Sequence, residues 1–139
     1  MIALCVFVFG YFFSQYNGNI EGMVWKSKGD GEKRKYDFTY DATNRLLTAD
    51  FNQYTSGSFN KSAAIDFSLN SMSYDGNGNI LSLQQAGLKL NSSSTIDNLT
   101  YTYQTGSNKL QQVTDAANDN TSRLGDLCRC WVRHEFNEC

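Results

Sequence analysis

The sequence predicts an all-β fold of consecutive antiparallel β-hairpins that together form a strip of β-sheet. A unit made of a Tyr, a turn and a Leu or Ile recurs along the 139-residue chain. Aromatic and polar residues alternate before the turns, which is typical of half-buried strands. The one stretch with helix-like spacing, residues 83–90, is short and contains Gly87, so helices are not expected.

The repeated unit occurs four times, the first time only partially. In chain order the copies are Tyr16-Asn17-Gly18-Asn19-Ile20, Tyr40-Asp41-Ala42-Thr43-Asn44-Arg45-Leu46, Tyr74-Asp75-Gly76-Asn77-Gly78-Asn79-Ile80 and Tyr103-Gln104-Thr105-Gly106-Ser107-Asn108-Lys109-Leu110. Successive Tyr residues are about 24, 34 and 29 residues apart, within the range typical of arrays of supersecondary units. The chain is therefore interpreted as a repeat protein.

Each copy contains the three parts of a hairpin. Before the turns, residues 36–41, 72–74 and 99–103 alternate in polarity. The turns are rich in Asp, Asn, Gly, Thr and Ser, which accept positive φ or cap their own backbone, and the chain has no proline. After the turns the chain extends again, and strand, tight turn and strand make a β-hairpin. The residues expected to fix the repeat are Tyr40, Asp41, Asn44, Arg45, Leu46, Tyr74, Asp75, Gly78, Asn79, Ile80, Tyr103, Gly106, Asn108 and Leu110.

These motifs resemble the YD repeat of the rearrangement-hotspot (RHS) family, as found in Bacteroidetes-like bacteria. In that pattern a Tyr-Asp pair is followed by loose positions, then Gly or Asn, Arg or Ile, and Leu. The second and third copies match it directly, and the fourth, which lacks the Asp, matches in degraded form. The resemblance covers residues 14–115.

The resemblance implies a segment of a large secreted or cell-surface bacterial polypeptide. In such proteins the repeats wind a β-sheet shell around a toxic C-terminal domain, and teneurins use the same architecture for adhesion. In that family the repeats form the shell and do not catalyse a reaction. The implied partners are neighbouring YD repeats of a longer chain, or self-association through sheet edges, and an enclosed toxin domain. The family's proline-containing, self-cleaving core is not expected, because the chain has no proline.

Neither an enzyme nor a cofactor is expected. The chain has one His and no Gly-x-Ser-x-Gly, phosphate-loop or dinucleotide fingerprint. A net charge of −2 gives no reason to expect nucleic acid, and the basic cluster at residues 26–35 is interpreted as a solvated hairpin tip. Residues 75–79 alternate oxygen ligands as calcium loops do. They lack the Gly and Glu that an EF-hand needs at Ile80 and Ala86, so a hairpin turn is preferred.

The two ends differ from the repeat region. Residues 1–13 are strongly apolar and are interpreted as a signal, an anchor or a strand. Residues 116–139 form a non-repeat, Cys-rich tail, in which Cys128, Cys130, His134 and Cys139 could hold zinc or form disulfides. The tight Cys-x-Cys spacing makes zinc the weaker reading.

Two further functions stay open beside the shell module. A cell-surface carbohydrate- or protein-binding β module would use exposed Tyr residues and Trp25, and a small zinc-stabilised module would use the tail. The shell and the carbohydrate binder differ in the position of their aromatic rings. A shell packs the rings against neighbouring strands, whereas a sugar binder keeps them exposed and coplanar.

Overall fold

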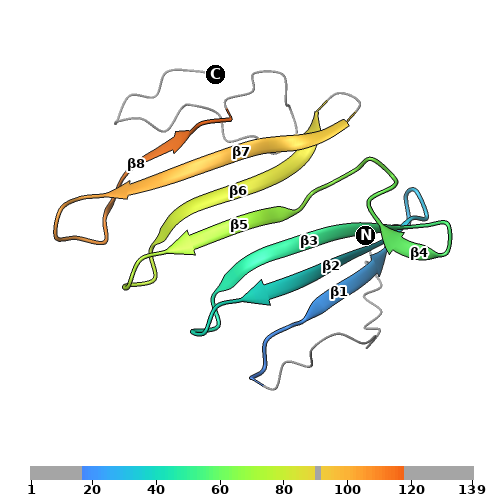
Figure 1. The fold of residues 1–139 in the computed structure, drawn as a ribbon, viewed down its shortest axis with the longest axis horizontal. Coiled ribbons are helices and arrows are strands. Elements are labelled where there is room, and N and C mark those ends of the chain that lie inside the picture. Colours follow the sequence, from blue (N-terminus) through green and yellow to red (C-terminus); the bar gives the residue numbers. More distant parts are fainter. Residues whose placement is uncertain (1–16, 90–91, 118–139) are drawn as a thin grey trace.

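The structure, a computed structural model, describes residues 17–89 and 92–117. These residues form one antiparallel sheet of eight strands and contain no helix (Figure 1), so the predicted all-β fold is confirmed. The strands are β1 Gly22–Lys26, β2 Lys33–Tyr40, β3 Leu46–Thr55, β4 Ser58–Asn60, β5 Leu69–Tyr74, β6 Ile80–Lys89, β7 Ser92–Tyr103 and β8 Leu110–Asp115. The described part of the chain contains no helix long and apolar enough to cross a membrane.

The strands lie in the sheet almost in the order of the chain, β1-β2-β3-β5-β6-β7-β8. This is the predicted succession of hairpins. β4, which pairs only with β3, was not predicted. Its turn is made by Ser56 and Gly57, whose φ angles of 53° and 93° are both positive, as a tight two-residue hairpin turn requires.

One face of the sheet carries an aromatic cluster, Trp25, Tyr36, Phe38, Phe51 and Phe67. The register places Tyr36 opposite Phe51. The Phe51 ring lies 5.4 Å from that of Tyr36 and 5.4 Å from that of Phe67, edge to face in both cases. Phe51 is 1% exposed and forms the centre of this half of the core.

A second apolar centre lies between β6 and β7. Ile96 is 1% exposed, Leu99 is 3% exposed and Ala86 is 5% exposed. Gly87 permits this packing, since a Cβ placed there would lie 2.5 Å from the Cδ1 atom of Ile96.

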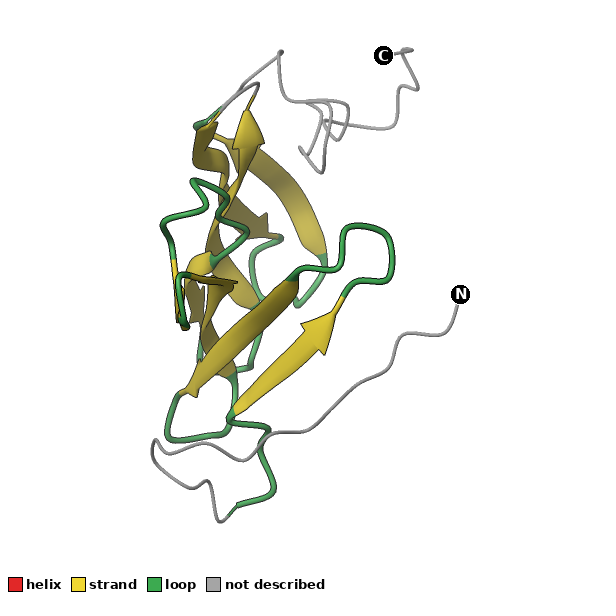
Figure 2. Cartoon of the chain, turned by 90° about the vertical axis from the view of Figure 1, so that its right-hand side faces the viewer, coloured by secondary structure: helices red, strands yellow, loops and turns green. Residues whose placement is uncertain are grey.

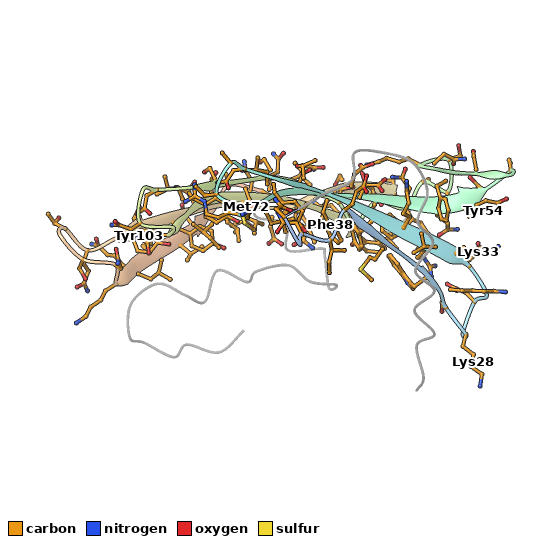
Figure 3. The ribbon with its side chains drawn as sticks, turned by 90° about the horizontal axis from the view of Figure 1, so that it is seen from below. Lys28, Lys33, Phe38, Tyr54, Met72 and Tyr103 are labelled. Carbon is orange, nitrogen blue, oxygen red and sulfur yellow. The ribbon has the colours of Figure 1, made fainter. Side chains whose placement is uncertain are left out.

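The described strands form a single layer. Figure 2 shows the strands twisting past one another, and Figure 3 shows the sheet edge-on as one curved layer with side chains on both faces. Only five hydrophobic residues among the described ones are buried. A layer this thin depends on cross-strand contacts for stability rather than on a deep core.

The junction between β3 and β5 is the thinnest in the sheet, with a single paired position, Ala49 opposite Leu69. Side chains strengthen it. The Ser68 hydroxyl accepts a hydrogen bond from the backbone N–H of Phe51 at 2.9 Å. The Lys61 ammonium lies 3.0 Å from Ser68 and forms an ion pair with Asp66 at 3.0 Å. Polar groups therefore hold together two strands whose ladder is short.

Candidate functional site

The three complete copies of the repeated unit place their turns at one end of the sheet, on the left in Figure 1. We call this end the turn edge; it consists of residues 41–45, 75–79 and 104–109, with residues 17–20 beside the first of them. The basic cluster lies at the other end, in the tip between β1 and β2, where Arg34 forms an ion pair with Asp30 at 2.6 Å.

In the first turn the carboxylate of Asp41 holds the loop closed. Its Oδ1 atom accepts hydrogen bonds from the backbone N–H groups of Thr43 at 2.8 Å and Arg45 at 2.9 Å. Its Oδ2 atom lies 2.6 Å from Nε of Arg45. Asn44 completes the turn in the left-handed region, with φ of 65°. These bonds favour the ionised carboxylate, and the backbone N–H of Arg45 is the main reason that the pKa of Asp41 lies below its usual value.

The second turn repeats this arrangement with other side chains. Oδ1 of Asp75 accepts from the backbone N–H groups of Asn77 at 2.9 Å and Asn79 at 2.8 Å. The side-chain amide of Asn79 donates to Oδ2 at 2.8 Å and is the main cause of the lowered pKa of Asp75. Gly78, with φ of 88°, takes the place of Asn44. The Asp of the repeat thus serves turn closure, and the described residues contain no group of three or more His, Cys, Asp or Glu that could hold a metal.

The third turn manages without the Asp. Gln104 stands in its place, and the serine hydroxyl of Ser107 accepts from the backbone N–H of Lys109 at 3.1 Å. The positive φ moves to Gly106, at 69°. The backbone bond that closes the turn is kept, from Gln104 N–H to the Lys109 carbonyl at 2.9 Å.

A β-bulge follows each turn at the same place. Thr39 pairs with Thr48 but Tyr40 pairs with Leu46, so Leu47 is an extra residue in β3; the equivalent extra residues are Leu81 in β6 and Gln111 in β8. Period-two alternation in the sequence does not indicate these bulges, because an extra residue leaves the local composition unchanged. In all three cases the residue that faces the bulge from the neighbouring strand is the Tyr of the repeat.

The three residues opposite the bulges form a tyrosine row, Tyr40, Tyr74 and Tyr103. Each hydroxyl donates a hydrogen bond to the backbone carbonyl of the residue that ends the preceding unit. Tyr40 donates to Ile20 at 2.8 Å, Tyr74 to Leu46 at 2.7 Å and Tyr103 to Ile80 at 2.8 Å. Every described unit is thereby bonded to the one before it.

Side chains of adjacent turns also meet along the turn edge. The side-chain amides of Asn17 and Asn19 donate to Oδ1 of Asn44. Those of Asn77 and Asn79 donate to Oδ1 of Asn108, at 3.3 Å and 2.9 Å. Between the first and second complete turns the contact is different.

There Nη1 of Arg45 donates to the backbone carbonyl of Asp75 at 3.0 Å. The Arg45 guanidinium also lies over the ring of Tyr74, 4.6 Å from its centroid. Sequence reasoning singled out most of these residues for their own turns but did not anticipate the bonds between turns. The recurrence of Asn-Gly-Asn-Ile, at residues 17–20 and 77–80, is a sequence signal that could have indicated them.

The residues expected to fix the repeat lie either in the turn edge or at the strand ends directly beside it. These hairpins and the bonds between them make up one antiparallel sheet of consecutive β-hairpins. Comparison with known protein families, characterised proteins and solved structures found no match. The expectations for residues 1–13 and for Cys128, Cys130, His134 and Cys139 fall outside the described residues.

Proposed function

We propose that the chain is a structural wall module, a non-catalytic segment of a secreted or cell-surface β-sheet shell of the RHS type. The tyrosine row carries this proposal. The same hydroxyl-to-carbonyl bond, made three times within a range of 2.7 to 2.8 Å, joins successive units into one sheet. In repeat proteins such contacts between neighbours supply the stability that a single unit lacks.

Both carboxylates of the turn edge are already used within the sheet. The carboxylates of Asp41 and Asp75 accept hydrogen bonds from their own turns. Their lowered pKa values make them poor proton donors near neutral pH, because general acids need a pKa close to the working pH. This supports a role in holding shape rather than in chemistry.

The aromatic cluster also favours a wall over a carbohydrate binder. The rings of Trp25 and Tyr36 are stacked, 5.4 Å apart with 20° between their planes, and those of Tyr36 and Phe38 are stacked at 5.9 Å and 18°. Stacked rings cover one another's faces, which a sugar platform needs free. The Tyr36 hydroxyl is also used inside the protein, since it donates a hydrogen bond to the Phe67 carbonyl at 2.9 Å.

The test is to read the coding DNA on both sides of this frame and to screen the purified chain on a glycan array. A wall module predicts further Tyr-turn-Leu units in the flanking DNA and no glycan bound. Unrelated neighbours, together with a glycan whose binding is lost in Trp25→Ala, would overturn the proposal in favour of the carbohydrate-binding module.

A further inference from the structure

The tetrapeptide Asn-Gly-Asn-Ile occurs twice in the turns, at residues 17–20 and 77–80. Asn17 and Asn77 are the two Asn residues of the whole sequence that precede a Gly. An Asn-Gly pair can react within itself, because glycine has no side chain to keep its backbone nitrogen away from the Asn side chain. The other Asn residues of the turns precede Arg, Ile or Lys, whose side chains hinder the same attack.

The side chain of Asn77 is exposed and is held by one long hydrogen bond. Its amide group donates to Oδ1 of Asn108 at 3.3 Å, and among residues 17–89 and 92–117 its own Oδ1 atom accepts no hydrogen bond. The side chain of Asn17 is held twice. Its amide donates to Asn44 at 2.5 Å, and its Oδ1 atom accepts from the backbone N–H of Asn19 at 3.1 Å. Asn77 therefore rotates more freely toward the glycine that follows it.

The backbone at Gly78 is also open to rearrangement. Gly78 is exposed, has φ of 88°, and nothing lies within 4 Å of a Cβ built on it. Its N–H donates to the Asp75 carbonyl at 3.2 Å, whereas the equivalent bonds of Asn44 and Ser107 both measure 3.0 Å. The nitrogen of Gly78 is thus the most weakly bound of the three at this position of the turn.

We propose that Asn77 is a site of spontaneous deamidation, which converts it to aspartate or isoaspartate. The backbone nitrogen of Gly78 gives up its proton and attacks Cγ of Asn77. A bond forms between that nitrogen and Cγ, and the side-chain nitrogen leaves as ammonia, carrying the proton with it. Water then adds to either carbonyl of the resulting succinimide ring and opens it, to aspartate in one case and to isoaspartate in the other. Water is the only other reactant.

The reaction weakens the link between the second complete turn and the third. The new carboxylate has no N–H to donate and faces Oδ1 of Asn108, which accepted the former bond. It also adds a negative charge close to Asp75, which stays ionised because the Asn79 amide holds its pKa below the usual value. Isoaspartate, in addition, lengthens the backbone inside a tight turn. Of the two amides that reach Asn108, only that of Asn79 then remains.

The test compares the two Asn-Gly pairs of the full-length chain, folded and unfolded. The protein is kept in a mildly alkaline buffer, with or without concentrated urea, and its peptides are mapped at intervals by mass spectrometry. In urea we expect similar rates, because the same residues follow each Asn. In the folded chain Asn77 should react about fivefold faster than Asn17, the ratio that one additional hydrogen bond on Asn17 implies. If Asn17 reacts as fast as Asn77 there, or if Asn77 stays intact, the proposal is overturned.

A second measurement follows the consequence in Asn77→Asp, which reproduces one product of the reaction. Limited digestion with trypsin reports opening of the third turn through cleavage after Lys109, which is exposed. We expect this cleavage to be about fivefold faster than in wild type, because loss of one hydrogen bond raises the open population. Cleavage after Lys28, at the opposite end of the sheet from Tyr103 (Figure 3), is the internal control and should not change. Equal cleavage after Lys109 in the two proteins would overturn the assigned consequence. Neither measurement bears on the wall function, which the flanking DNA decides.

Discussion

The hydroxyl of Tyr74 donates a hydrogen bond at 2.7 Å to the backbone carbonyl of Leu46, 28 residues earlier in the chain. The bond crosses the junction between β3 and β5, where the strand ladder has a single paired position. A side chain thus supplies what the backbone lacks at this junction. The same bond recurs at Tyr40 and Tyr103, where the ladders are longer.

Replacing Tyr74 by Phe removes this bond and leaves the carbonyl of Leu46 without its partner. We expect the free energy of unfolding to fall by about 1 to 1.5 kcal/mol, the usual net contribution of one hydrogen bond. Urea unfolding followed by tryptophan fluorescence measures it. Tyr54→Phe is the matched control, because Tyr54 is exposed and its hydroxyl has no partner among the described residues. Equal losses in the two variants would contradict the role assigned to Tyr74.

Gly78 lies at φ of 88°, a region that L-residues with branched side chains rarely adopt, although nothing lies within 4 Å of a Cβ built there. Gly78→Val is therefore expected to destabilise the protein by about 1 to 2 kcal/mol through backbone strain alone. Thermal unfolding of Gly76→Ala supplies the control, since Gly76 is equally open but lacks the positive φ. Gly78→Asn should be tolerated better than Gly78→Val, because Asn44 holds φ of 65° at the equivalent place. Unchanged stability of Gly78→Val would refute the assignment of this turn.

Gly87 is required for a different reason, because Ile96 leaves no room for a side chain at this position. A Cβ at residue 87 would lie 2.5 Å from Cδ1 of Ile96, so Gly87→Ala overpacks the core and should cost about 1 to 3 kcal/mol. Ile96→Val deletes that Cδ1 atom. We expect the double variant Gly87→Ala/Ile96→Val to be more stable than the sum of the two single losses implies. Strict additivity in a double-mutant cycle would show that the two residues do not clash.

The carboxylates of the turns should make the stability of the sheet depend on pH. The pKa values of Asp41 and Asp75 lie below the ordinary 3.8 in the folded protein, because backbone and side-chain N–H groups bond to the ionised form. The unfolded chain then binds protons more readily than the folded one. The stabilisation is complete above the unfolded pKa and is lost as the pH falls below about 4. In urea titrations at a series of pH values, the double variant Asp41→Asn/Asp75→Asn should lose less stability on acidification than wild type.

The sequence predicts those features of the fold that depend on a few neighbouring residues. Asp41 and Gly78 were identified as turn residues because turn chemistry acts over four or five residues. The alternation of Tyr36 and Phe38 with Asp37 likewise gave their shared face correctly. β4 could not be predicted, because its turn places Ser56 at a positive φ and serine is not a residue type that indicates one.

The contacts between turns could not be predicted in the same way. Asn17 and Asn44 are 27 residues apart, and their bond depends on the register of two strand pairs that lie between them. The bulge at Tyr40 adds a further shift that period-two alternation does not contain. From the sequence, each turn is therefore predicted separately, and no contact between turns is predicted.

The bulges have a geometric consequence. Each one bends its strand and adds local twist, and each lies at the same position of its hairpin, opposite Tyr40, Tyr74 or Tyr103. The bend is thus encoded once per hairpin rather than by the sheet as a whole. Each added hairpin of this kind would bring one more bend, so the number of hairpins determines how far such a sheet curves in total.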